Sequence, residues 1–276
     1  MTHIKIREKF FDDKVEIVRR GRPVDWSIEG LNEQKDLKKS TLRKKFEQVK
    51  SLCVPKGINT IWAPTSTDFN SVISETIDFT NEITDGEFRI YRGVMADGLE
   101  VPENDGVFLA SADCPTIIAF DPQKNRLVVA HAGRNCLLDR QLIDTNTPSR
   151  DHFSVVDAVI DKLGTNIKVH IALGIKSKNF THLVTDPVYG ESNDRMLKFI
   201  FEKYSNCFYW QPEEGQLSLS MLIKAQLEIY GVRRISWDNL DTYEDKNQNG
   251  DLLWHSYSRD RTSKRNGILV CRNPSA

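Results

Sequence analysis

The sequence predicts an α/β or α+β protein, because stretches with helical periodicity alternate along the chain with short apolar stretches typical of strands. Two junctions support this prediction. The helical stretch 149–164 leads directly into the strand-like IKVHIALG, and the helical stretch 217–230 is followed at Gly231 by the strand-like VRRISW. The polar loop 241–251 separates these elements from extended pieces near the C-terminus.

The predicted helices follow from apolar spacing and from their end signals. Residues 36–53 have the pattern of an amphipathic surface helix, and we interpret the lysines between its apolar positions as a solvent-facing side. The stretch 149–164 begins with Ser and Asp residues and ends at Gly164, which is typical of helix caps. Two more helices are expected at about 191–205 and 217–230.

Composition excludes several classes of protein. The chain has 276 residues, 39% of them hydrophobic and 28% charged, which is typical of a soluble globular protein. With 38 basic and 39 acidic side chains the net charge is -1, so no overall field favours nucleic acid or an anionic membrane. The first twenty residues lack the apolar core of a signal peptide. We therefore expect a cytoplasmic protein with no nucleic-acid or membrane partner; the sequence indicates no oligomeric state.

The cysteines predict neither a disulfide framework nor a zinc ribbon. They are odd in number, scattered, and contain no C-x-x-C pair. We expect each of them to be a free thiol: Cys53, Cys114, Cys136, Cys207 and Cys271.

Residues 105–140 contain the clearest candidate site. Two apolar strands, 116–120 and 127–130, flank the turn sequence DPQKN and predict a β-hairpin. A four-residue loop over 121–124 would pair Phe120 with Asn125 and place Cys114 opposite His131; a five-residue loop would offset them by one position. In either register the thiol and the imidazole meet at the open end of the hairpin, beside Gly133.

Three roles are compatible with this pair. His131 could lower the pKa of the Cys114 thiol and make it a nucleophile. Both side chains could instead bind zinc, since thiolate and neutral imidazole are suitable ligands. Alternatively, Cys114 is a small core residue and His131 a hydrogen-bonded strand end. The spacing does not choose among these three.

The string ADC-P, a short hairpin and then V-A-HAG resemble the signature of the laccase-domain or polyphenol oxidase family, whose members are mostly described as zinc-dependent purine nucleoside phosphorylases. Shorter pieces are similar too: GLN at 30–32, Ala96-Asp97, IALG at 171–174 and SYSRD at 256–260. The resemblance implies one layered α/β/β/α unit with mixed β-sheets over residues 1–276, more variable over 1–55. This fold is shared with the Cys–His deamidase domain of cytotoxic-necrotizing-factor-like toxins.

The resemblance also implies a zinc site built from His, Cys and His. Cys114 and His131 carry over directly, with Asp113 fixing the local turn. The family's first histidine lies in a Q-V-H-G motif, and the matching stretch here, 65–68, has no histidine. Asp68 is a candidate third ligand. Cys136 and His255 are further candidates that the fold could bring from elsewhere.

We expect substrate-binding residues in the two stretches where the sequence differs from the family pattern, 131–136 and 256–260. The family's HAG-W-R-G is HAGRNC here, which puts Arg134 and Asn135 beside the site, and SYSRD contributes Arg259. The implied activity is phosphorolysis or hydrolysis of the ribose–base bond of adenosine or inosine, so the expected partners are a nucleoside and phosphate. Two alternatives stay open: a metal-free Cys–His hydrolase or deamidase, and a catalytically inactive binding protein of the same fold.

Overall fold

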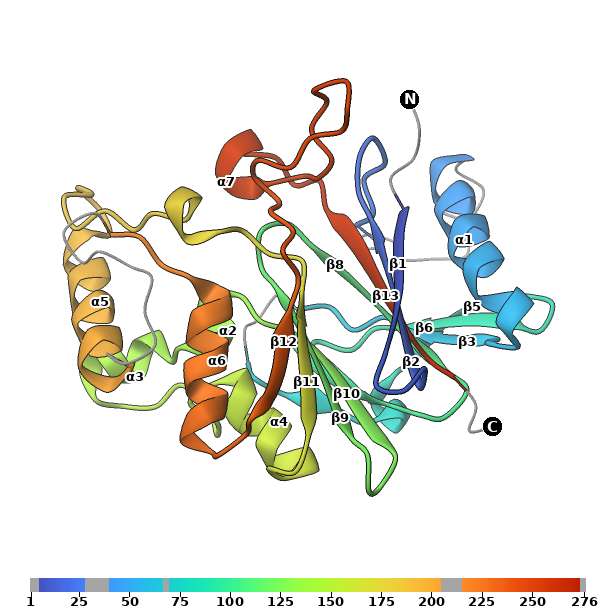
Figure 1. The fold of residues 1–276 in the computed structure, drawn as a ribbon, viewed down its shortest axis with the longest axis horizontal. Helices are drawn as coiled ribbons and strands as arrows, with labels where there is room; N and C mark the ends of the chain where they lie inside the picture. Colours follow the sequence, from blue (N-terminus) through green and yellow to red (C-terminus); the bar gives the residue numbers. More distant parts are fainter. Residues whose placement is uncertain (1–4, 28–39, 67–69, 205–214, 274–276) are drawn as a thin grey trace.

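Two mixed β-sheets pack face to face in the computed structural model, which describes residues 5–27, 40–66, 70–204 and 215–273 (Figure 1). The seven-stranded sheet has the order β1 Lys5–Phe10, β2 Val15–Arg20, β13 Asn266–Arg272, β8 Gly106–Ser111, β3 Thr60–Trp62, β6 Phe88–Arg92 and β5 Asn81–Asp85. The six-stranded sheet has the order β12 Arg234–Trp237, β11 Lys168–Ala172, β9 Thr116–Asp121, β10 Arg126–His131, β7 Gly98–Val101 and β4 Ile73–Ser74. The predicted α/β class with mixed sheets is confirmed.

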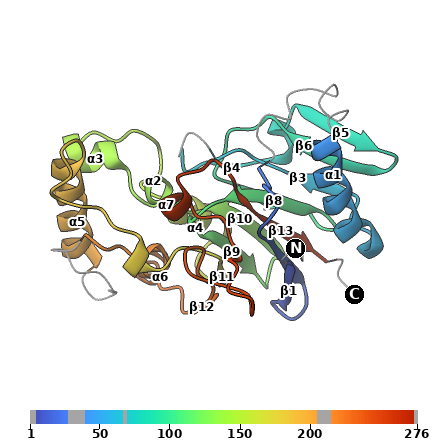
Figure 2. The ribbon, with the colours of Figure 1, turned by 90° about the horizontal axis from the view of Figure 1, so that it is seen from above.

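Helices cover the outer face of each sheet (Figure 2). They are α1 Ser40–Cys53 on one side, and on the other α2 Arg134–Leu137, α3 Arg140–Thr145, α4 Val155–Leu163, α5 Gly190–Tyr204 and α6 Leu219–Ile229, with α7 Tyr257–Asp260 near the ends of the strands. Short 3₁₀ turns occur at Val54–Lys56, Thr76–Asp78 and Ser177–Asn179. Among the described residues, none of these helices is long and apolar enough to cross a bilayer.

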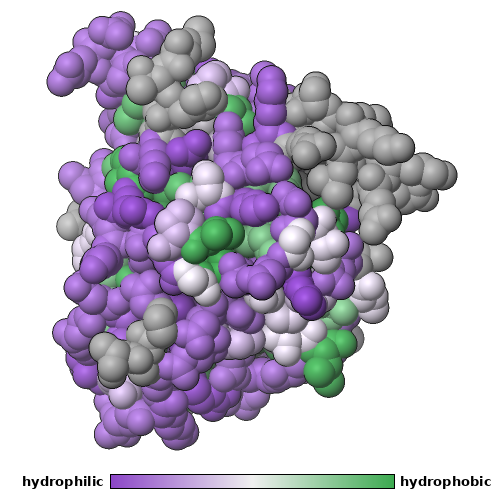
Figure 3. All heavy atoms as spheres, turned by 90° about the vertical axis from the view of Figure 1, so that its right-hand side faces the viewer, coloured by the Kyte–Doolittle hydropathy of each residue, from purple (hydrophilic) through white to green (hydrophobic). Residues whose placement is uncertain are grey.

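Strand alternation divides the core into three layers. Leu127 and Val129 of β10 pack between the two sheets, whereas Val128 and Ala130 face the helices. A third layer packs α1 onto the outer face of the seven-stranded sheet. His131 is two residues beyond Val129, so it continues the face of β10 that is turned toward the other sheet. The face of the molecule around α1 is mainly hydrophilic, with apolar side chains in small separate groups (Figure 3).

The four predicted helices are present, one of them with a later start, whereas the short helices α2, α3 and α7 were not predicted. The segments expected at 191–205 and 217–230 are α5 and α6, and the expected helix 36–53 is α1, although 36–39 lie outside the described residues. The helix expected from residue 149 begins only at Val155. Ser154 and Asp157 form a capping box there, each side chain accepting a hydrogen bond from the other's backbone N–H. The residues before Ser154 are not helical. There, the backbone N–H and the hydroxyl of Ser149 both donate hydrogen bonds to the carboxylate of Asp139.

The hairpin is present, but both predicted registers are wrong. Phe120 pairs with Leu127 and His131 with Thr116, so the open end is offset by two positions from the four-residue prediction. The cause is Asp121, which stays in the strand while its side chain accepts hydrogen bonds from the backbone N–H groups of Gln123 and Lys124. A shift of two residues leaves side chains on the same face of the sheet, so Cys114 and His131 still point the same way.

Candidate functional site

Cys114 lies in the connection from β8 to β9, and Asp113 sets the path of that connection. Asp113 has a positive φ of 76°, and its carboxylate accepts hydrogen bonds from the Thr242 hydroxyl (2.8 Å) and from the Ser258 backbone N–H (2.6 Å). Ser111 donates to the Cys114 carbonyl at 2.7 Å. Asp113 therefore ties the turn that carries Cys114 to the C-terminal segment.

Gly133 provides the space between Cys114 and His131. A Cβ atom at residue 133 would lie 2.9 Å from Cys114 Sγ, 3.1 Å from His131 Cε1 and 3.5 Å from His131 Nε2. The thiol and the Nε2 edge of the imidazole thus approach the same point from two sides. Any larger residue would fill the volume that a reacting group or an ion needs here.

The other edge of the His131 ring is held by a buried polar network. Nδ1 lies 2.6 Å from Ser66 Oγ, and Ser66 Oγ lies 2.6 Å from Asp97 Oδ1. An ionised carboxylate only accepts, so the Ser66 hydroxyl proton goes to Asp97, and Ser66 accepts from Nδ1–H of His131. Nε2 consequently carries the lone pair, and this nitrogen faces Gly133 and Cys114.

Asp97 is fully buried, and every described hydrogen bond of its carboxylate comes from a donor. Besides Ser66, it accepts from the Ser71 backbone N–H at 2.6 Å and from the Cys136 thiol at 3.3 Å. Its own carbonyl accepts from the His131 backbone N–H at 2.7 Å. The carboxylate thus fixes both the orientation and the tautomer of His131, as carboxylate–histidine pairs do in metal and catalytic sites.

Burial keeps both candidate catalytic groups uncharged at neutral pH. It lowers the pKa of His131 to about 4, with Arg265 acting in the same direction and Asp97 opposing. It raises the pKa of the Cys114 thiol to about 12, with a further contribution from Asp113, while Arg265 and Arg134 pull it down. A neutral base therefore stands beside a protonated thiol.

The described residues complete only one three-ligand group. Asp97, His131 and Cys136 offer ligand atoms that all lie within 4.8 Å of one another, and Cys136 Sγ is 3.3 Å from both His131 Nδ1 and Asp97 Oδ1. This donor set and spacing could bind a metal ion. The group is built around Nδ1 of His131, whereas Cys114 approaches the Cε1 and Nε2 side of the ring.

On the Nε2 edge, the described residues supply two ligands, Cys114 and His131, where a catalytic zinc uses three protein ligands. Asp68 lies outside the described residues. Cys136 lies on the opposite edge of the ring, and the ring of His255 contacts the Val24 carbonyl at 2.9 Å. Within the described part of the chain, the zinc site implied by the family resemblance is not complete.

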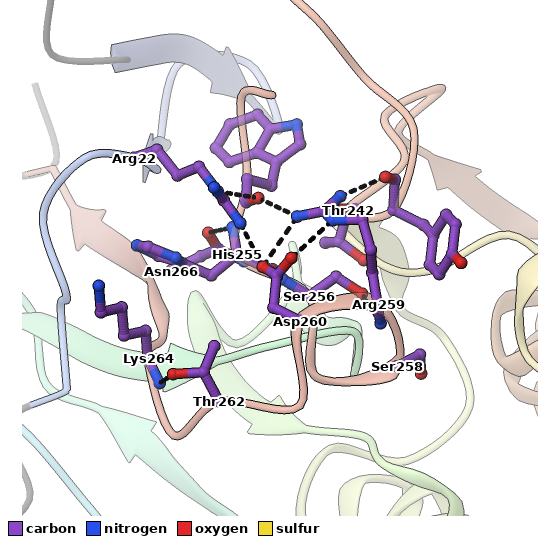
Figure 4. A network of polar contacts seen from close by, with 12 residues as sticks. Arg22, Thr242, His255, Ser256, Ser258, Arg259, Asp260, Thr262, Lys264 and Asn266 are labelled. Carbon is purple, nitrogen blue, oxygen red and sulfur yellow. Dashed lines mark hydrogen bonds and ion pairs between the residues drawn. The ribbon is translucent and has the colours of Figure 1, made fainter. Parts of the chain in front are cut away.

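The predicted substrate-binding residues fall into two groups. Arg134 and Asn135 directly follow Gly133, and Arg134 Nε donates to Asn135 Oδ1 at 3.3 Å. Arg259, by contrast, donates from Nε and from both terminal nitrogens to Asp260 and to the carbonyls of Thr242, Tyr243 and Trp254 (Figure 4).

Arg259 therefore braces the C-terminal segment, and its donors are directed at protein groups. Arg22 completes this network by donating to Asp260 and to the Trp254 carbonyl (Figure 4). Although burial opposes it, hydrogen bonds from Arg259, Ser256 and Arg22 lower the pKa of Asp260 to about 2.

Sequence reasoning did not single out Ser66 or give Asp97 a role. The sequence contained a signal for each of them: Asp97 belongs to the Ala-Asp pair, and Ser66 falls in the stretch 65–68 that matches the family's first histidine motif. The parallel bridge between Thr65 and Met95 brings Ser66 close to Asp97. Because that bridge joins segments that are distant in sequence, no periodic pattern of residues predicts it.

A comparison with family models identifies the family of the chain. A family model described as multi-copper polyphenol oxidoreductase laccase matches residues 80–272, a span that includes Asp97, Cys114 and His131. The chain belongs to this family. The resemblance predicted from ADC-P and HAG is thereby confirmed. None of the curated proteins compared with the chain matches it.

Three solved structures share the fold at low identity. YfiH of Bacillus licheniformis is 17% identical, with a TM-score of 0.58, and the match covers 94% of this chain and 93% of that one. NMB0706 of Neisseria meningitidis is 14% identical, with a TM-score of 0.64 and coverages of 98% and 99%. YlmD of Geobacillus stearothermophilus is 16% identical, with a TM-score of 0.63 and coverages of 94% and 92%. These likenesses establish the fold of this laccase-family chain.

Proposed function

We propose that this laccase-family protein cleaves the ribose–base bond of a purine nucleoside, adenosine or inosine, with water or phosphate as the attacking group. The observation that supports this proposal is the hydrogen-bond chain from Asp97 through Ser66 to Nδ1 of His131, from which we assign the lone pair to Nε2, the nitrogen that faces the space over Gly133. The nucleoside itself is inferred from the family resemblance. No step is assigned to zinc, because the described residues supply only two ligands on this edge.

His131 is the general base in the proposed reaction. Its Nε2 accepts a proton from the attacking water or phosphate as the new C–O bond forms at the anomeric carbon. The ribose–base bond breaks with its electron pair going to the purine, and the proton on His131 returns to the purine nitrogen. The net products are purine and either ribose or ribose 1-phosphate. The Asp97–Ser66 pair keeps Nε2 free to accept that proton.

Base release measured by chromatography tests the proposal. Adenosine and inosine are each supplied with and without phosphate, using protein whose metal content has been measured. We expect His131→Asn to lower base release by about 100-fold or more, the usual contribution of a positioned acid or base. His152→Asn is the matched control, because His152 lies in the turn before α4. Absence of base release from the parent protein under every condition refutes the proposal.

The uncharged Cys114–His131 pair supports a second candidate, a metal-free hydrolase or deamidase. In that reaction Nε2 takes the thiol proton, the thiolate attacks an amide carbon, and ammonia leaves with the proton from His131. Water then hydrolyses the thioester. This candidate requires the thiolate to form readily at neutral pH, although burial raises the pKa of Cys114 to about 12.

Alkylation followed by peptide mass spectrometry decides this candidate. Rapid, selective modification of Cys114 in the folded protein would show that the thiolate forms readily and would favour the hydrolase. A thiol that reacts only after unfolding would leave nucleoside cleavage as the better proposal. A protein that releases no base and whose Cys114 stays unreactive would favour the third alternative, a catalytically inactive binding protein of the same fold.

A further inference from the structure

A second group of catalytic residue types lies at one edge of the six-stranded sheet. Strand β12 forms that edge and pairs in parallel with β11 (Figure 1). His170 of β11 pairs with Ser236 of β12, so the two side chains lie on the same face of the sheet. Ser236 Oγ is 2.9 Å from His170 Nδ1, and His170 Nε2 is 2.9 Å from Asp238 Oδ1. A serine, a histidine and a carboxylate thus form one chain of contacts that shares no residue with the Cys114 site.

Asp238 decides which nitrogen of His170 carries the proton. An ionised carboxylate only accepts, so Nε2–H of His170 donates to Asp238 Oδ1. Arg19 Nη2 donates to the same oxygen at 2.6 Å, which explains why it also lies 3.2 Å from Nε2. The Ser236 hydroxyl lies 3.3 Å from the Val169 carbonyl and closer, at 2.9 Å, to Nδ1. Nδ1 therefore carries the lone pair and accepts from the serine, as the base of a Ser–His–Asp triad does.

The carboxylate of Asp238 is fixed and stays ionised. Oδ2 accepts from Arg19 Nε at 2.5 Å and from the Leu173 backbone N–H at 2.9 Å. Although burial opposes it, the hydrogen bond from His170 and the charge of Arg19 lower the pKa of Asp238. Arg19 also forms an ion pair with Glu8 at 2.9 Å. One positive charge thus faces two negative charges, and an imidazolium at His170 would balance them.

The serine is accessible, and a backbone donor follows it. Ser236 is exposed on the edge strand. The backbone N–H of Asp238 donates toward β11, to the Ile171 carbonyl at 3.0 Å. Successive N–H groups of a strand point to opposite sides, so that of Trp237 points to the edge that no described strand covers. The N–H of the residue after a nucleophile is a frequent oxyanion donor.

We propose that Ser236, His170 and Asp238 hydrolyse a carboxylic ester. Ser236 Oγ bonds to the carbonyl carbon while its proton passes to Nδ1 of His170; the ester C–O bond then breaks, and the alcohol leaves with that proton. Water next attacks the acyl group and gives a proton to Nδ1. That proton returns to Ser236 Oγ as the carboxylic acid is released.

The surroundings of the base favour an apolar acyl group. The partly buried ring of Phe10 stacks on the His170 ring with 4.0 Å between ring centroids. Glu8, which is half-exposed, adds negative charge on the same side through its ion pair with Arg19. An acidic acyl group would be repelled there, so we commit to a neutral, short-chain ester.

Hydrolysis of p-nitrophenyl butyrate tests the site on the full chain. We expect Ser236→Ala and His170→Gln each to lower kcat/KM by about 100-fold or more. Asp238→Asn should lower kcat with little change in KM, because it acts through His170. Ser51→Ala is the matched control, since Ser51 is an exposed serine whose hydroxyl donates to the Gln48 carbonyl.

A fluorophosphonate identifies the nucleophile independently. Ser236 Oγ should bond to phosphorus and displace fluoride, and peptide mass spectrometry should find the phosphonyl group on Ser236. Circular dichroism melting confirms that each variant is folded, which is expected of Ser236→Ala because its side chain is exposed. The proposal is overturned if the parent hydrolyses the ester no faster than Ser236→Ala, if Ser51→Ala loses as much activity, or if the phosphonyl group is found only on other residues.

Discussion

Gly133→Ala is the sharpest test of the site geometry, because the new methyl group would enter the space between Cys114 and His131. Gly133 has φ −73° and ψ 170°, which any residue adopts, so the substitution adds no backbone strain. Its Cβ would lie 2.9 Å from Cys114 Sγ and 3.1 Å from His131 Cε1. Both atoms must move, and overpacking of this kind lowers the free energy of unfolding by about 1–3 kcal/mol.

A double-mutant cycle isolates that contact. Cys114→Ala removes the sulfur, so the double variant Gly133→Ala/Cys114→Ala should be more stable than the sum of the single effects predicts, by about 1 kcal/mol. The free energies of unfolding come from urea titrations monitored by tryptophan fluorescence. Additive effects, or a Gly133→Ala protein as stable as the parent, would show that the thiol and imidazole do not converge over Gly133. Base release should be lost in Gly133→Ala whatever its stability.

Three further predictions concern the surroundings of the site and the sheet packing. Ser66→Ala breaks the link between Asp97 and Nδ1 of His131 and should lower kcat/KM for base release about 10- to 100-fold, whereas Ser66→Thr keeps the hydroxyl and most of the rate. Asp238→Ala removes the carboxylate that the fully buried Arg19 binds through two nitrogens and leaves the half-exposed Glu8 as its partner, so it should lower the free energy of unfolding by about 3 kcal/mol. Asp144→Ala, at a partly exposed ion pair with Arg195, should cost about 1 kcal/mol or less. Burial lowers the pKa of His131 from 6.5 to about 4 and that of His182 from 6.5 to about 3, so the unfolded chain binds more protons than the folded chain below pH 6.5. The melting temperature should therefore fall as the pH drops from about 6.5 toward 4. His182→Gln should make the melting temperature less dependent on pH over this range. A melting temperature that rises over this range would contradict the neutral state assigned to both histidines.

Local signals made most of the secondary structure predictable. Helix α4 ends before Gly164 as expected, and α6 ends at Ile229, just before the turn at Gly231. The start of α4 was missed because several Ser and Asp residues precede it, and only Ser154 has Asp157 at capping-box spacing with apolar residues following. The hairpin register depended on one side chain, Asp121, which caps the turn from inside the strand.

The site was predictable only as far as its residues lie close in sequence. Cys114 and His131 belong to one hairpin, so strand pairing alone brings them together. Ser66 and His182 reach His131 and Arg134 through contacts between segments 65 and 48 residues apart, which no periodicity encodes. Arg259 shows the converse limit, because its motif predicts a ligand-binding cation, while Asp260 and three backbone carbonyls take its donors.

The organisation of the buried polar groups favours chemistry over a purely structural role for His131. Apolar residues of similar volume would fill the space around Asp97 and Ser66 with equal or greater stability, because burying a carboxylate carries a desolvation penalty. Here that carboxylate is fully buried, and through Ser66 it leaves one imidazole nitrogen unprotonated. That nitrogen, Nε2, faces Gly133, which has no Cβ and lies next to the Cys114 thiol. The residue after Gly133 is Arg134, which has no carboxylate partner in the described part of the chain. If the Asp97–Ser66–His131 network served packing alone, the lone pair of His131 Nε2 would not need to face the space over Gly133.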